Sequence, residues 1–185
     1  MGQVSQATAN ILKIIYLSMF GEKEAEALQQ LDSLLAAQGL RVRPCGLFVD
    51  TEAGYLAASP DGVLDEDTLV EVKCPLKCRD RAIADLAASD SSFCLGLDPD
   101  TGTPALKRSH NYYYQVQGQL HCAGRTRCVF MVWAPSEHHL ETVHYDPEFW
   151  AEMEESLQRF YLDCLLPEIV DPRAPRGRMV REPRA

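Results

Sequence analysis

The sequence predicts an α/β (α+β) domain in which helices flank a mixed central sheet. Segments with apolar residues at three- and four-residue spacing alternate with short apolar segments that are typical of strands. Some of the predicted strands follow one another directly and others are separated by a helix, which favours a mixed sheet. With 185 residues, of which 46% are hydrophobic, the chain can build one domain with a sizeable core. We place this domain at residues 1–170 and expect the Pro- and Arg-rich residues 171–185 to be disordered.

The helices are predicted by amphipathic spacing, and the strands by short apolar or alternating segments. The predicted helices are Ile11–Leu40 with an interruption near Gly21, Arg79–Ala88, His110–Ala123 and Phe149–Leu165. The predicted strands are Gly46–Val49, Tyr55–Ala58, Leu69–Cys74, Cys128–Trp133 and His139–Tyr145. Residues 89–103 are rich in Ser, Asp, Gly and Pro and indicate an irregular loop. No apolar run reaches the ~20 residues of a membrane-spanning helix, so we expect no membrane partner.

The net charge of −9 argues against a nonspecific nucleic-acid binder, because such proteins are usually basic. It does not argue against an enzyme whose carboxylates hold cations. DNA would then need local basic groups, and Lys77, Lys107 and Arg108 are candidates. The seven cysteines are an odd number, lie singly and follow no secretory signal. We therefore expect free thiols and an intracellular location.

The candidate catalytic residues lie around one predicted strand. Glu71 and Lys73 share one face of this strand, a pattern that alone is typical of a half-exposed strand. Asp61 lies in the turn Ser59–Gly62 ahead of it, so a hairpin would bring the two carboxylates together. Neighbouring carboxylates need a neutralising cation, and Mg²⁺, with Mn²⁺ as a substitute, prefers such oxygen ligands. The Val72 carbonyl is a further candidate ligand, and Lys73 is placed to act on water or phosphate.

Two segments in this order resemble the PD-(D/E)xK nuclease superfamily: Ser59-Pro60-Asp61-Gly62, and Glu71-Val72-Lys73-Cys74-Pro75. More closely, the chain resembles the YqaJ-type viral recombinase, or lambda exonuclease-like, family. Gly46-Leu47-Phe48-Val49 and Tyr112-Tyr113-Tyr114-Gln115-Val116-Gln117-Gly118-Gln119 add to this resemblance. The similarity extends from about residue 20 to residue 170.

The resemblance implies a restriction-endonuclease-like fold and Mg²⁺-dependent exonuclease cleavage of DNA, expected to be double-stranded with a free end. It implies Asp61 and Glu71 as metal ligands and Lys73 as the catalytic lysine. The family's helix acid matches Glu24 best, with Glu22 and Glu26 left open. Its Tyr-x-x-Gln helix maps onto Tyr112 and a catalytic Gln115. The expected DNA contacts are Tyr112, Gln119, Ser59, Lys77, Lys107 and Arg108.

Several alternatives stay open at this point. Relatives carry an additional N-terminal helical region, so we expect the N-terminal part to be truncated here, and a homo-oligomer is possible. The chain is alternatively a nucleic-acid-binding module that kept the fold and lost cleavage. A zinc site is a further alternative, because Cys74 and Cys78 are followed later by His121, Cys122 and Cys128.

Overall fold

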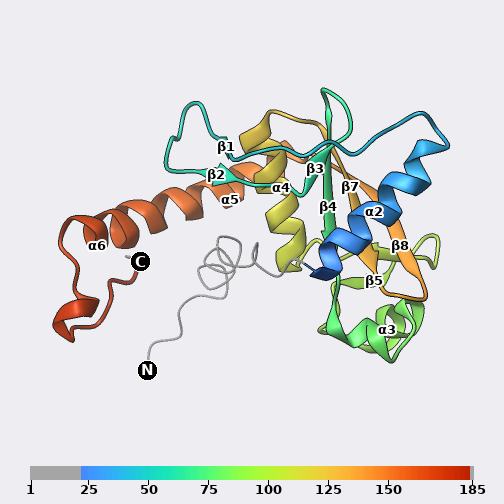
Figure 1. Ribbon diagram of the computed structural model, residues 1–185. Coiled ribbons are helices and arrows are strands. Elements are labelled where there is room, and N and C mark those ends of the chain that lie inside the picture. The colour runs from blue at the N-terminus through green and yellow to red at the C-terminus, as the bar shows by residue number, and fades with distance from the viewer. Residues whose placement is uncertain (1–21, 184–185) are drawn as a thin grey trace. The chain divides into compact units, whose positions relative to one another are not determined.

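The computed structural model describes residues 22–183, which divide between two compact units. Of the described residues, 22–145 belong to one unit and 146–183 to the other (Figure 1). The part of the predicted first helix before residue 22 lies outside the described residues. Among the described helices, none is both long and apolar enough to cross a membrane.

The larger unit is built on a sheet with the strand order β3-β4-β7-β8. Its strands are β3 (Gly62–Val63), β4 (Thr68–Lys73), β7 (Arg127–Trp133) and β8 (His138–His144). The neighbours β4 and β7 are parallel, whereas the β3–β4 and β7–β8 pairs are antiparallel. The predicted mixed sheet is therefore confirmed.

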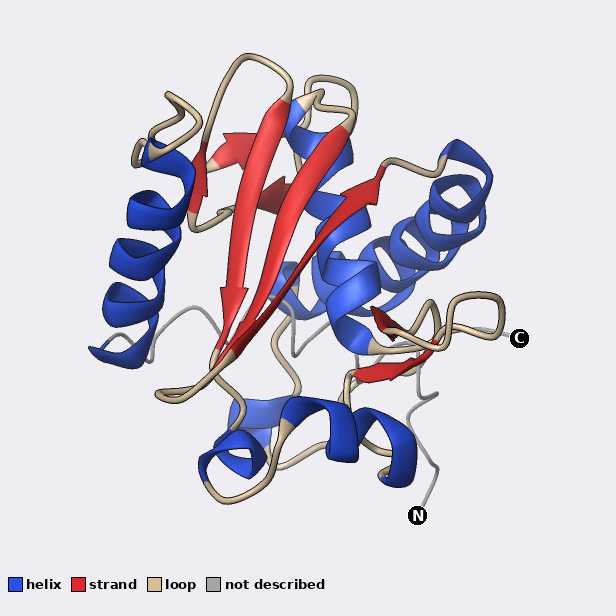
Figure 2. Ribbon diagram, turned by 90° about the vertical axis from the view of Figure 1, so that its right-hand side faces the viewer, coloured by secondary structure: helices blue, strands red, loops and turns tan. Residues whose placement is uncertain are grey.

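Helices cover both faces of this sheet (Figure 2). Helix α2 (Glu22–Ala36) packs its Ala27, Leu31 and Leu35 against Val70 and Val72 of β4. Helix α4 (Asn111–Ala123) lies on the face to which Glu71 points, as the hydrogen bonds from its glutamines show. Alternation along β4 thus separates an apolar face from a polar one, as the sequence predicts.

The helix α4 begins and ends at sequence signals. The Nδ1 atom of His110 accepts a hydrogen bond from the Tyr112 backbone N–H, and Gly124 ends the helix in the left-handed conformation at φ 61°. This left-handed cap favours glycine. The side chains of Tyr113, Val116 and Leu120 are buried, so the predicted core face of the helix is confirmed.

Short elements complete this unit. They are β1 (Phe48–Val49), which pairs with β2 (Ala57–Ala58), the 3₁₀ turn Leu76–Arg79, α3 (Ile83–Ser89), β5 (Leu95–Leu97) and β6 (Pro104–Leu106). The expectation of an irregular loop over residues 89–103 is wrong in part, because β5 pairs with β6 in an antiparallel hairpin. Its turn is held by Asp98, whose carboxylate accepts hydrogen bonds from the backbone of Asp100 and Thr101. The turn-forming residues that suggested a loop therefore form the tip of a hairpin.

The smaller unit is mainly helical. Helix α5 (Pro147–Phe160) is capped by Asp146, and a π-helical turn (Tyr161–Leu165) leads into α6 (Leu166–Val170). Within the tail, residues 174–176 form a 3₁₀ turn, and Arg181 pairs with Glu168 at 2.8 Å. The single domain over residues 1–170 and the disorder of the tail stay predictions.

Candidate active site

The segment directly before β3 fixes the position of Asp61. Its backbone N–H donates to the Val70 carbonyl at 3.1 Å, and its Oδ2 atom accepts from the Val72 N–H at 2.8 Å. The next residue, Gly62, lies so close to the backbone of Arg43 that a Cβ atom on Gly62 would be 3.0 Å from the Arg43 carbonyl oxygen. Glycine is therefore required for the close approach that sets Asp61 at the edge of β4.

Glu71 is the most enclosed acidic side chain of this centre, with 1% of its surface exposed. Its Oε1 atom accepts hydrogen bonds from the Lys73 amine and from Gln115 Nε2, the latter at 2.7 Å. Its Oε2 atom accepts from Gln119 Nε2 at 2.8 Å. β4 is therefore not a half-exposed strand, because donors from β4 itself and from α4 enclose the Glu71 carboxylate.

Lys73 lies between this carboxylate and an aromatic ring. Its amine forms an ion pair with Glu71 and lies 5.0 Å from the centre of the Tyr112 ring. Burial alone would lower the pKa of Lys73, but the attraction of Glu71, and then of Asp61, outweighs it and raises the pKa. The amine is therefore held in its charged form.

The excess of negative charge at the centre has its largest effect on the pKa of Asp61. Burial, followed by repulsion from Glu71, raises the pKa of Asp61 to about 7. The Val72 N–H and the Lys73 charge oppose this rise but do not cancel it. Together with Glu71, Asp61 thus places two acidic groups beside the Lys73 amine, a balance that favours a further cation.

Glu24 of α2 adds to the same field. Burial raises its pKa, and its charge interacts with Lys73 and Glu71. By contrast, Glu26 is exposed and pairs with Lys23 at 3.5 Å. Between Glu24 and Glu26, Glu24 is therefore the one that the structure brings to the site, while the side chain of Glu22 lies outside the described residues.

The donors fit a hard divalent cation. Asp61 and Glu71 supply carboxylate oxygens, and the Val72 carbonyl faces the same edge as the Val72 N–H that binds Asp61. Within residues 22–183, no group of three His, Cys, Asp or Glu side chains is arranged to hold a metal ion. Mg²⁺ needs only one or two carboxylates because it keeps several waters. The centre therefore suits Mg²⁺ better than zinc, which takes four protein ligands in its structural sites.

The cysteines give no support to the zinc alternative. All seven are free, as expected, and Cys78 and Cys128 are buried. Burial raises the pKa of Cys74 and of Cys78 to about 11, which keeps these thiols protonated. Among the described residues, none of these cysteines belongs to a group of three His, Cys, Asp or Glu side chains that could hold a metal ion.

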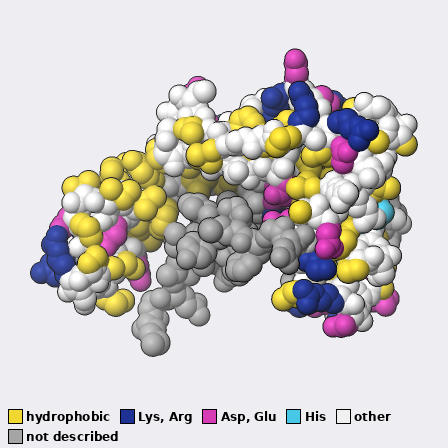
Figure 3. Space-filling view, viewed as in Figure 1, with side chains coloured by type: hydrophobic (Ala, Val, Ile, Leu, Met, Phe, Trp, Pro, Cys, Tyr) yellow, Lys and Arg dark blue, Asp and Glu magenta, His cyan; other side chains and the backbone are white. Residues whose placement is uncertain are grey.

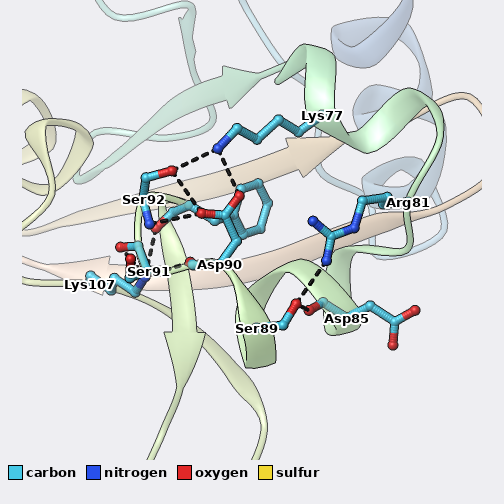
Figure 4. Close-up of polar contacts among 9 residues, drawn as sticks. Lys77, Arg81, Asp85, Ser89, Asp90, Ser91, Ser92 and Lys107 are labelled. Atoms are coloured by element: carbon cyan, nitrogen blue, oxygen red, sulfur yellow. Dashed lines mark hydrogen bonds and ion pairs between the residues drawn. The ribbon is translucent and has the colours of Figure 1, made fainter.

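The lysines expected to contact DNA meet elsewhere, at the turn of residues 90–93 (Figure 4). The Lys77 amine bonds to Asp90 Oδ2 and to Ser92 Oγ, each at 2.7 Å. The Lys107 amine bonds to the carbonyl oxygens of Ser91 and Phe93. Both amines therefore hold the turn, and their contact with DNA stays a prediction.

The remaining expected DNA contacts divide between the surface and the interior. Ser59 and Arg108 are exposed, and the guanidinium of Arg108 stacks on the Tyr113 ring at 5.2 Å. Tyr112 and Gln119 instead face Lys73 and Glu71. On the face drawn in Figure 3, Lys and Arg side chains lie in small separate groups beside Asp and Glu. Any DNA contact on this face would therefore use few cations at a time.

The sequence did not predict that Gln119 binds Glu71. The signal for it was present, because Gln115 and Gln119 lie four residues apart on one helix face. The sequence did not indicate that this face of α4 lies opposite β4.

The chain is similar to known proteins in sequence and in fold. Residues 35–126 match the family described as the YqaJ-like viral recombinase domain. No curated protein sequence matches the chain. Among solved structures, the chain is similar to an alkaline exonuclease (LHK-Exo) from Laribacter hongkongensis, with 20% identity and a TM-score of 0.57 over 88% of this chain and 81% of that one. It is also similar to LHK-Exo in complex with dAMP, with 19% identity and a TM-score of 0.52 over 83% and 85%. The predicted nuclease-type fold is therefore confirmed.

Proposed function

Because the chain belongs to the YqaJ-like viral recombinase family, we propose that it is a Mg²⁺-dependent exonuclease that hydrolyses phosphodiester bonds of double-stranded DNA. The observation that carries this proposal is the meeting of Asp61, Glu71 and Lys73 at one edge of β4. The similarity to an alkaline exonuclease supports it. That neighbour has also been solved in complex with dAMP, a nucleotide, which accords with a nucleic-acid substrate for this chain.

The electrostatics of the centre support a metal-dependent reaction. Two carboxylates face one amine, and the raised pKa of Asp61 shows that the imbalance is felt there. A bound Mg²⁺ would neutralise phosphate charge and lower the pKa of a bound water. Asp61, Glu71 and the Val72 carbonyl are the residues that would hold it, with Glu24 close enough to add negative charge.

Lys73 has a distinct role in this proposal. Since its pKa is raised, the amine is protonated at neutral pH and is unsuited to accept a proton from water. Its charge is suited to stabilise the negative charge that develops on the scissile phosphate. The Tyr112 ring beside the amine limits the space that Lys73 can enter and helps keep it at the centre.

Gln115 acts through Glu71. Its amide nitrogen donates a hydrogen bond to Glu71 Oε1 and so orients the carboxylate. Any effect of Gln115 on the attacking water would therefore be indirect, through the position of Glu71. The exposed Ser59 and Arg108 are the remaining candidates for contact with the DNA backbone.

A cleavage assay tests this function. The purified chain is incubated with linear and with covalently closed circular duplex DNA, in Mg²⁺ or in EDTA. We expect degradation of the linear duplex only, dependent on Mg²⁺, and lost in Glu71→Gln. The matched control is Glu66→Gln, which changes an exposed glutamate in the turn between β3 and β4 and leaves degradation unchanged.

Other outcomes separate the alternatives. Cleavage of circles would show an endonuclease. DNA binding without Mg²⁺-dependent cleavage would contradict the proposal and indicate a binding module that kept the fold.

A further inference from the structure

Gln119 occupies a buried position against the acidic centre. It lies on α4, only 2% of its surface is exposed, and its Nε2 atom donates to Glu71 Oε2 at 2.8 Å. Gln115, one turn earlier, donates to the other oxygen of the same carboxylate. Two amides from one helix face therefore hold the two oxygens of Glu71.

The two oxygens of Glu71 differ in their remaining capacity to bind. Each oxygen of an ionised carboxylate offers about two lone pairs. Oε1 accepts from both the Lys73 amine and Gln115, whereas Oε2 accepts from Gln119. Oε2 is therefore the oxygen with capacity left for a further ligand, and it is the one that Gln119 holds.

The other end of the Gln119 amide is unsatisfied. Its Oε1 atom is buried and has no hydrogen-bond partner among the described residues. Reversal of the amide would not help, because it would set this oxygen against the Glu71 carboxylate. A buried acceptor needs a donor, and in a centre rich in oxygen acceptors a water molecule is the donor that fits.

We propose that Gln119 is a positioning residue of the metal centre. Its amide nitrogen presents Glu71 Oε2 to the divalent cation, and its carbonyl oxygen accepts a hydrogen bond from a water that the cation carries. This inference rests on the proposed function. Mg²⁺ and Mn²⁺ sites of this kind keep waters, and the groups that orient a metal ligand affect metal affinity strongly.

Mn²⁺ binding in the absence of DNA tests this role. We compare the full chain with Gln119→Met, which removes both amide contacts at similar size. The matched control is Gln117→Met, because Gln117 lies on the same helix, is also fully buried and donates to the His144 carbonyl. Free Mn²⁺ is followed by electron paramagnetic resonance, and the melting temperature of each metal-free protein is recorded.

We expect Gln119→Met to weaken Mn²⁺ binding by about 10- to 100-fold. Gln117→Met should bind as the wild-type chain does, although it also loses a buried hydrogen bond. Equal Mn²⁺ affinity in the two variants would overturn the inference. If Gln119→Met does not fold, Gln119→Asn replaces it, since its shorter amide does not reach Glu71, with the same expected and contrary results.

The inference and the proposed function fail in different ways. A wild-type chain that binds Mn²⁺ but does not cleave DNA would contradict the exonuclease alone. A wild-type chain that cleaves DNA while Gln119→Met binds Mn²⁺ normally would contradict the role of Gln119 alone. A wild-type chain that binds no Mn²⁺ would contradict both.

Discussion

Two regions of the larger unit pair lysines with carboxylates, and they differ in charge balance. At the centre on β4, Asp61 and Glu71 face one amine, and the pKa of Asp61 rises to about 7. At the turn of residues 90–93, Lys77 and Asp90 pair one to one, and their hydrogen bond lowers the pKa of Asp90. The first region is short of positive charge, whereas the second is satisfied by the chain itself. A buried excess of carboxylate, more than the presence of an ion pair, therefore indicates where a cation and a substrate would bind.

The largest expected effect comes from Lys73→Met at the unbalanced centre. It removes the charge that we propose stabilises the phosphate, and we expect the cleavage rate to fall by about 10³-fold. The control is Lys23→Met, which removes an exposed amine of α2 and should leave the rate unchanged. Rates are measured on linear duplex DNA in Mg²⁺, and a similar loss in both variants would contradict the role of Lys73.

The raised pKa of Asp61 predicts a pH dependence of stability in the metal-free protein. A carboxyl with a pKa of about 7 in the folded state and an ordinary value near 4 when unfolded binds more protons in the folded state between these limits. Stability that is present at low pH is therefore lost as the pH rises towards 7. We expect a loss on the order of 3 kcal/mol, after allowance for solvent around this carboxyl.

The comparison with Asp61→Asn isolates this effect. Urea titrations at pH 5 and pH 8 give the unfolding free energy of each protein. The value for the wild-type chain minus that for Asp61→Asn should fall with rising pH. Mg²⁺ should reduce the dependence in the wild-type chain. A difference that does not change with pH would contradict a raised pKa of Asp61 in the folded protein.

Gly62→Ala should disturb the position of Asp61 without touching its charge. The added Cβ would lie 2.8 Å from Val42 Cγ1 and 3.0 Å from the Arg43 backbone oxygen. We expect a loss of stability of about 1–3 kcal/mol. The control Gly54→Ala adds a methyl group where nothing lies within 4 Å. Thermal unfolding measures both, and equal stability of the two variants would contradict the close approach.

Lys107→Met tests whether the lysines at the turn of residues 90–93 stabilise the fold and do not bind DNA. It removes the amine that binds the carbonyls of Ser91 and Phe93, and we expect a loss of about 1 kcal/mol in unfolding free energy. The salt dependence of DNA affinity should stay the same, since this amine already has partners. A shallower salt dependence would instead show a phosphate contact and sharpen the site at this turn.

The sequence predicted which side chains meet at β4 better than those at residues 90–93, because alternation along a strand is a local pattern. Alternation along β4 placed Glu71 and Lys73 on one face, as their contact confirms. The hairpin expected between Tyr55–Ala58 and Leu69–Cys74 does not form, because β2 pairs with β1 and β4 pairs with the short strand β3 instead. The contacts of Lys77 and Lys107 were not predicted, because they depend on how β5 and β6 close around residues 90–93. Turn-forming residues in that stretch hid a hairpin whose strands are only three residues long. Long-range placement of this kind has no signature in local spacing.

The short strand β3 shows the same limit. Its two residues carry no periodic pattern, and it is recognised only through pairing with Leu69 and Val70. The buried environment of Glu71 also could not be predicted from the strand alone, because it requires α4 to lie opposite β4.

Diffraction from a crystal of this chain soaked in Mn²⁺, collected near the manganese absorption edge, tests the account most directly. We expect an anomalous peak in coordination distance of the carboxylates of Asp61 and Glu71, absent from a crystal of Glu71→Gln. A peak at any other place alone, or a pair of carboxylates with no manganese beside them, would contradict the metal centre.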